Sequence, residues 1–280
     1  MKKTLFVFFL FGLMISQSYA AELKLKMPNG LVSNAAYVQG DEAKPVILLL
    51  HGFLQTHHFS TVSRLLEGLS GEGYSVLSPT MSLGIPDRKK SLACEALHDH
   101  TMEDDLEELD VWINWLKDKG HKKIVLAGHS QGATTLLNFL LDRNKPEITK
   151  FIAISIIEVS MSRSRTENDR MLKELKNKIK NNSREPFISS LSFCVKYLGT
   201  PKSFISYQYW SPDKIIESLK QVKIPVKMIM GGSDNRLRNN WIRELKKAGK
   251  SLTVIEGANH FLDGFNEFDL LEVILSDLKI

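Results

Sequence analysis

The pentapeptide "GHSQG", residues 128–132, lies between two stretches of different character. The preceding "KKIVLAG" is β-branched and apolar, which is typical of a buried strand, and the following "ATTLLNFLLD" is typical of a helix. A sharp turn from strand to helix can present one side chain, and glycine at both ends lets the backbone close without Cβ clashes. The pattern therefore predicts that Ser130 is held at the end of a strand as a nucleophile.

Alternation of strand-like and helix-like segments extends in both directions from this turn. Apolar runs bounded by turn residues predict strands over 22–27, 33–40, 44–52, 74–80, 123–128, 150–157, 225–232 and 251–257. Helical spacing of apolar residues predicts helices over 59–73, 101–120, 133–143, 166–182, 238–249 and 266–280. Such alternation indicates an α/β domain, a mostly parallel sheet with helices on both faces.

One segment interrupts this alternation. Residues 158–222 follow the sixth predicted strand and are too long for a simple crossover, so we expect an inserted helical cap there. The segment begins with the basic amphipathic helix 166–182 and continues with the aromatic stretch 187–210. The aromatic side chains are expected to form the core of the cap. The basic helix is expected to face solvent or, alternatively, to contact anionic lipid headgroups weakly.

The first twenty residues have the character of a secretory signal peptide. Lys2 and Lys3 precede an apolar run, and a small-x-small sequence ends at Ala20, after which cleavage is expected. The alternative, an uncleaved membrane anchor, is disfavoured because the apolar run is short for a membrane span. We therefore expect a mature α/β domain over residues 21–280 that is periplasmic or secreted.

The net charge and the cysteine content are consistent with an exported protein. Loss of Lys2 and Lys3 lowers the formal net charge from +5 to +3, which is too small to indicate nucleic-acid binding. The two cysteines of the chain, Cys94 and Cys194, would meet an oxidising compartment after export. We expect them to form a disulfide that ties the loop after strand 74–80 to the cap, the alternative being two buried free thiols.

An acid and a base for the serine are expected after it, in that order along the chain. Asp234 follows the strand 225–232, and His260 follows the next strand, so both are expected at strand ends. In this interpretation His260 accepts the proton of Ser130 and Asp234 orients His260. Glu158, at the end of an earlier strand, is the alternative acid.

The histidine pairs His57–His58 and His98–His100 raise the question of a metal site. No carboxylate or cysteine spacing near them matches a zinc signature. We expect solvated loop histidines, the alternative for one or two of them being a place at the mouth of the pocket, and no metal or cofactor.

In this order, "LLLHGF", "GHSQG", "GGSDN" and "GANHF" resemble the α/β-hydrolase superfamily over residues 30–280. The similarity is greatest to bacterial serine hydrolases of the monoacylglycerol-lipase, serine-aminopeptidase and dienelactone-hydrolase-like groups. The resemblance implies an oxyanion hole of two backbone N–H groups, here those of Gln131 and Phe53, with Leu54 as the alternative to Phe53. It implies no cofactor.

These observations predict an exported serine hydrolase that acts on a small-molecule or lipid-like ester or thioester through an acyl-serine intermediate. A serine peptidase or aminopeptidase would use the same Ser130, His260 and Asp234. A non-catalytic binding protein on the same fold is the alternative from a different class.

Overall fold

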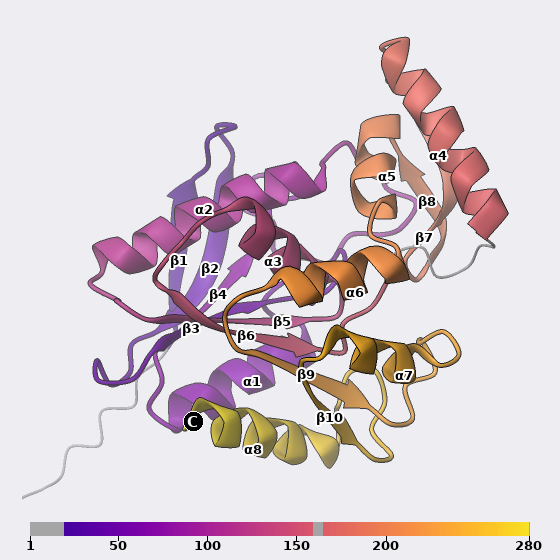
Figure 1. Cartoon of the computed structure of the whole chain (residues 1–280). Helices are drawn as coiled ribbons and strands as arrows, with labels where there is room; N and C mark the ends of the chain where they lie inside the picture. The colour runs from indigo at the N-terminus through magenta and orange to yellow at the C-terminus, as the bar shows by residue number, and fades with distance from the viewer. Residues whose placement is uncertain (1–19, 159–164, 280) are drawn as a thin grey trace, which may run out of the picture.

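An eight-stranded, mostly parallel sheet forms the centre of the molecule (Figure 1). The computed structural model describes residues 20–158 and 165–279, so the expected signal peptide lies, except for Ala20, outside the described residues. The strands in spatial order are β1 (Ala21–Lys26), β2 (Val32–Val38), β4 (Val76–Thr80), β3 (Val46–Leu50), β5 (Ile124–His129), β6 (Ile148–Ile154), β9 (Val226–Gly231) and β10 (Ser251–Ile255).

The pairing of the strands decides where a site can form. β1 and β2 pair antiparallel, β2 pairs antiparallel with β4, and all pairs from β4 to β10 are parallel. The parallel strands therefore end at one edge of the sheet, where the loops after β3, β5, β9 and β10 come together. β5 lies between β3 and β6, so the residues that follow it are central to this edge.

Helices cover both faces of the sheet, as predicted. α1 (Ser60–Gly71) and α8 (Asn266–Leu278) cover one face, and α2 (Met102–Asp118), α3 (Gln131–Asp142) and α6 (Pro212–Gln221) cover the other (Figure 1). After β9 come α7 (Trp241–Leu245) and the 3-10 turn Lys246–Ala248. β3 shows why a continuously apolar strand is needed here: Leu48 packs into the core on one face, and Ile47 into the core on the other.

A capping box starts α2, as the sequence predicted. The Thr101 hydroxyl accepts the backbone N–H of Asp104 at 3.3 Å, and the Asp104 carboxylate accepts the backbone N–H of Thr101 at 2.7 Å. Two N–H groups of the first turn are thereby satisfied, which places the start of the helix at Met102.

The chain between β6 and β9 leaves the sheet, and we call its described residues 165–211 the cap. The cap consists of α4 (Arg165–Lys180), the antiparallel strands β7 (Phe187–Leu191) and β8 (Cys194–Gly199), and α5 (Pro201–Gln208). The expectation of a purely helical cap is therefore incomplete, because half of the aromatic stretch is a β-hairpin. The expectation of an aromatic core is confirmed for Tyr197, Phe204, Tyr207 and Trp210, which are buried, whereas Phe193 and Tyr209 are exposed.

The end of the insertion also differs from the prediction. α6, within the predicted range 158–222, packs against α3 in the helical layer of the sheet rather than in the cap. Its apolar face explains this position, because Ile215, Ile216 and Leu219 are buried in the same core as α3. Residues 159–164, the start of the predicted insertion, lie outside the described residues. In the part of the chain that the structure describes, no helix has the length and apolar character needed to cross a membrane.

Candidate active site

Ser130 occupies the turn between β5 and α3. Its backbone has φ 57° and ψ −127°, a strained conformation for a residue with a side chain, and its N–H donates to the carbonyl of Ile154 at 2.8 Å. The positions of the two flanking glycines have no room for a side chain. A Cβ on Gly132 would lie 2.2 Å from the carbonyl oxygen of His51, and one on Gly128 would lie 2.7 Å from the backbone nitrogen of Ala133. The sequence pattern "GHSQG" thus encodes a turn that larger residues could not form.

A chain of hydrogen bonds links Ser130 to the two residues expected as its partners. His260 Nε2 lies 2.9 Å from Ser130 Oγ, and His260 Nδ1 lies 2.7 Å from Asp234 Oδ2. All three residues are buried, with exposures of 9% or less. Because a carboxylate can only accept, the proton of the neutral imidazole is on Nδ1, and Nε2 is left to accept the proton of the hydroxyl. This is the arrangement that proton transfer from serine requires.

Glu158, the alternative acid, has a different partner. Its Oε1 lies 3.6 Å from Nε of Arg238, and the side chain is buried. The sheet order explains the difference. Asp234 follows β9 and His260 follows the adjacent β10, whereas Glu158 follows β6, which lies two strands from β10.

The loop after β3 lies against the nucleophile. A Cβ on Gly52 would be 3.3 Å from the Cβ of Ser130, so this backbone passes directly beside the serine. The amide N–H groups of Phe53 and Gln131 donate to no other described residue of the protein. Leu54, the alternative donor, has a positive φ of 60°. Its carbonyl accepts the backbone N–H of Leu92.

Two neutral histidines hold the loops around Ser130. Burial lowers the pKa of His51 to about 3. Its Nε2 accepts the N–H of Met81 at 3.1 Å, and Nδ1, which therefore carries the proton, donates to the carbonyl of Gly52 at 2.8 Å. Burial also lowers the pKa of His129 to about 3, and its Nε2 lies 3.0 Å from the carbonyl oxygen of His260. One histidine thus positions the loop after β3, and the other positions the loop that carries His260.

Arg88 is buried, and no sequence pattern predicted its role. Its guanidinium donates to four backbone carbonyls, those of Leu54, Gln55, Met81 and Lys90, at 2.6–3.3 Å. Burial lowers the pKa of Arg88 to about 10, and the carboxylates of Asp105 and Glu108 oppose that shift. Arg88 thereby joins the loop after β3 to the loop after β4. In the sequence it is one of several basic residues in a loop, and only packing distinguishes it.

The cap contacts the loop after β3 through aromatic rings. The ring of Phe53 lies 5.7 Å from that of Tyr197 on β8, 5.5 Å from that of Tyr207 on α5, and 6.0 Å from that of Phe193 in the hairpin turn. The cap therefore packs apolar surface against the side chain of Phe53, in the loop that carries one of the two expected oxyanion donors.

Three of the four histidines that raised the question of a metal are buried, so the expectation of solvated loop residues is wrong for them. His57, His98 and His100 are at most 5% exposed, whereas His58 is exposed. His98 stacks on Tyr197 with ring centres 4.4 Å apart, and Thr80 hydrogen-bonds His57 at 2.7 Å, so packing against the cap and β4 accounts for their burial. Among the described residues, no group of three or more His, Cys, Asp or Glu side chains is arranged to hold a metal ion.

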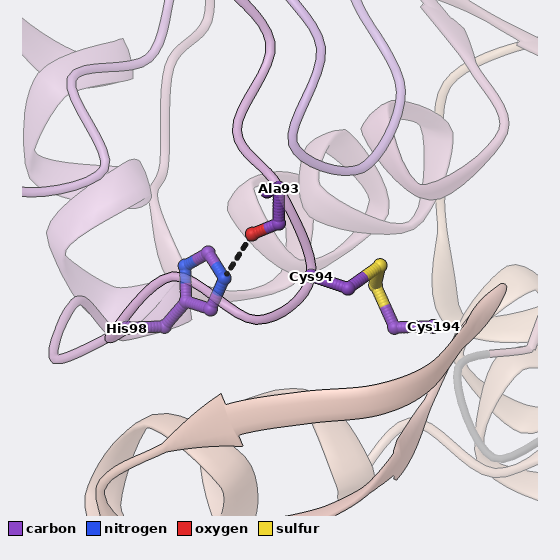
Figure 2. The surroundings of a disulfide bond; sticks show 4 residues. All are labelled: Ala93, Cys94, His98 and Cys194. Carbon is purple, nitrogen blue, oxygen red and sulfur yellow. Dashed lines mark hydrogen bonds between the residues drawn. A yellow bond between two sulfur atoms is a disulfide. The ribbon is translucent and has the colours of Figure 1, made fainter.

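Cys94 and Cys194 form a disulfide, as predicted. The bond joins the loop before α2 to the first residue of β8, and the two Cα atoms are 5.5 Å apart (Figure 2). The same loop pairs with β8 through backbone bonds, from His98 N to the carbonyl of Leu198 at 2.9 Å and from Leu198 N to the carbonyl of Cys94 at 3.1 Å. His98 in turn is bonded to the carbonyl of Ala93 at 3.1 Å (Figure 2). The hairpin of the cap is therefore attached covalently to the domain that contains the central sheet.

Removing this bridge is expected to lower the free energy of unfolding. The cysteines are 100 residues apart, and the chain-entropy model assigns up to about 4.7 kcal/mol to closing a loop of that length. Urea unfolding of a Cys94→Ala, Cys194→Ala double variant against the unreduced wild type measures the difference. Intact mass after alkylation without reductant is the control. Uptake of two alkyl groups by protein recovered from the periplasm would show that the bridge is absent.

Known structures share this arrangement of sheet and helices. Est1E from Butyrivibrio proteoclasticus aligns with a TM-score of 0.66 at 17% identity, covering 92% of this chain and 98% of its own. The esterase PF2001 from Pyrococcus furiosus aligns with a TM-score of 0.62 at 17% identity, covering 94% and 91%. The α/β hydrolase GrgF from Penicillium sp. sh18 aligns with a TM-score of 0.69 at 15% identity, covering 92% and 97%. At such identities the likeness establishes the fold.

A family model adds the evidence from sequence. The model described as "alpha/beta hydrolase fold" matches residues 45–192, slightly more than half of the 280 residues. The chain therefore belongs to the α/β-hydrolase fold family, and it is a hydrolase by fold and family. A comparison with curated proteins finds no match that would narrow this assignment.

Proposed function

We propose that this protein is an exported serine hydrolase that cleaves carboxylic ester or thioester bonds through an acyl-Ser130 intermediate. The observation that carries the proposal is the hydrogen-bond chain from Ser130 Oγ through His260 to Asp234. A serine hydroxyl becomes an effective nucleophile when a positioned base takes its proton, and the third group keeps that base in the correct tautomer.

The chemistry follows from these positions. Ser130 Oγ attacks the carbonyl carbon of the substrate while its proton passes to His260 Nε2. The N–H groups of Phe53 and Gln131 would stabilise the negative oxygen that forms, since preorganised amide donors act most strongly where charge develops. His260 then protonates the leaving alcohol or thiol. A water molecule, activated by the same histidine, releases the acid and restores the serine.

Location and substrate class have separate support. The Cys94–Cys194 disulfide is compatible with an oxidising compartment, as expected after removal of residues 1–20. The aromatic rings around Phe53 favour a small-molecule or lipid-like substrate with an apolar part. The exposed basic residues of α4, which include Arg170, Lys173 and Lys176, would make at most weak contact with anionic headgroups.

The function is tested by turnover of p-nitrophenyl esters compared with the aminoacyl-anilides that a peptidase would cleave. We expect hydrolysis of the esters and slow or no release from the anilides. A fluorophosphonate probe, located by mass spectrometry, should label Ser130 and no other residue. Faster cleavage of anilides would make the protein a peptidase, and no turnover or labelling at all would favour a binding protein.

A further inference from the structure

Arg236 lies where the cap meets the loops of the candidate triad. It is two residues beyond Asp234, and its backbone N–H donates to Asp234 Oδ1 at 2.9 Å. The centre of its guanidinium is 4.7 Å from the ring of Phe261, which follows His260, and 5.7 Å from the ring of Phe193 in the cap hairpin. Phe193 in turn contacts Phe53, with ring centres 6.0 Å apart. The guanidinium is thus held by aromatic contacts with both sides of the site.

The charge of Arg236 is not neutralised within the described protein. In residues 20–158 and 165–279, its guanidinium forms no ion pair and no hydrogen bond. Arg238, two residues further on, provides the contrast, because it pairs with Glu244 and lies 3.6 Å from Glu158. Cation–π contact attracts the charge of the guanidinium and does not use its N–H groups as hydrogen-bond donors to another polar group, so these groups remain able to bind a planar anion.

The position of this charge has an electrostatic cost for the proposed reaction. Burial chiefly lowers the pKa of His129, and the nearby His260 lowers it further; the backbone hydrogen bond to His260 and the carboxylate of Asp234 oppose that shift, and the charge of Arg236 adds a smaller lowering. His129 is a direct neighbour of His260, with ring centres 5.2 Å apart, so Arg236 lies close to the histidine pair. When His260 takes the serine proton it becomes an imidazolium, which the Asp234 carboxylate stabilises at 2.7 Å and which the positive charge of Arg236 opposes. An anion bound to Arg236 would remove this opposition.

We propose that Arg236 binds a carboxylate carried by the ester substrate, so that the enzyme prefers anionic esters over neutral esters of the same length. The inference rests on the proposed function, because it assigns the substrate class of the same site. Guanidinium and carboxylate match in a two-bond geometry, and such charge-assisted bonds are strong where water is partly excluded. Arg236 is therefore a specificity-determining residue, and the neighbouring rings of Phe193 and Phe261 hold it in place.

The test compares two esters with the same leaving group. Mono-p-nitrophenyl glutarate carries a carboxylate at the end of its acyl chain, and p-nitrophenyl valerate is a neutral ester of the same chain length. The measured quantity is the ratio of kcat/KM for the anionic ester to that for the neutral ester. In Arg236→Gln this ratio should fall roughly 10- to 100-fold, the effect of losing a hydrogen-bonded charge pair. Arg236→Lys keeps the positive charge but lacks the planar guanidinium that binds a carboxylate through two hydrogen bonds, so it should give an intermediate ratio.

Lys196→Gln is the matched control, since it removes one positive charge from an exposed position on β8. Its ratio should equal that of the wild type. An unchanged ratio in Arg236→Gln would overturn the inference and limit Arg236 to holding the cap, even if both rates fell together. If the wild type hydrolyses neither ester and Ser130 is not labelled by a fluorophosphonate, the proposed function fails, and this inference fails with it. Labelling and turnover of the neutral ester therefore separate the two failures.

Discussion

Replacing Ser130 by alanine is expected to reduce kcat for ester hydrolysis by about a million-fold, the loss seen when nucleophile and base act as one unit. The structural reason is that, among the described residues, the hydroxyl in hydrogen-bond contact with His260 Nε2 is that of Ser130, at 2.9 Å. The remaining rate would come from the oxyanion donors and substrate binding alone. The measurement is steady-state hydrolysis of p-nitrophenyl valerate by the purified variant.

Folding of this variant can be checked independently of activity. Alanine is smaller than serine and keeps the same backbone requirements at φ 57°, so the melting temperature should change little. Ser78→Ala serves as the comparison variant, because it also removes a buried serine hydroxyl. Ser78 lies in β4, outside the candidate site, and its hydroxyl donates to the carbonyl of Leu49 at 2.9 Å. Full esterase activity in Ser130→Ala would disprove the assignment of the nucleophile.

Replacing Asp234 by asparagine is expected to lower turnover by about 10,000-fold. The amide of asparagine can donate to His260 Nδ1, which would move the ring proton to Nε2. That nitrogen could then no longer accept the proton of Ser130, although the three side chains would keep their places. Steady-state rates of the variant and the wild type at one pH give the ratio.

Glu158→Gln is the control for this substitution. The side chain has nearly the same shape, and Glu158 lies beside Arg238 rather than beside His260. We expect the turnover of Glu158→Gln to stay within a few-fold of wild type. The substitution removes a buried charge near Arg238, so its effect is expected in the free energy of unfolding rather than in turnover. If Glu158→Gln were the inactive variant and Asp234→Asn the active one, the acid would have to be reassigned to the strand β6.

Several features of the molecule are encoded locally and were therefore predictable. The elbow around Ser130 depends on two glycines and on the change from apolar run to helical spacing, all within a dozen residues. The capping box at Thr101 is a contact between residues three apart. The sheet and its covering helices follow from periodicity, which reports which side of each element is buried.

Other features depend on contacts between residues distant in the sequence. The β-hairpin of the cap was missed because alternation in residues 187–199 is weak and its pairing depends on a turn at Ser192, with φ 52°. The burial of His98 and His100 follows from the position of the cap above them. Arg88 is recognisable only from the four carbonyls around it, which come from three separate parts of the loops after β3 and β4.

By itself, the sequence predicted the α/β-hydrolase fold, the turn at Ser130, and the chain order of the candidate nucleophile, acid and base. These depend on local backbone geometry and on burial patterns that each segment carries within itself. The tertiary structure alone decided that Asp234 rather than Glu158 meets His260, and that the guanidinium of Arg236 lies near the rings of Phe193 and Phe261. The physical reason is that these contacts depend on which strands are neighbours in the sheet and on where the cap packs, and no residue's local pattern encodes either.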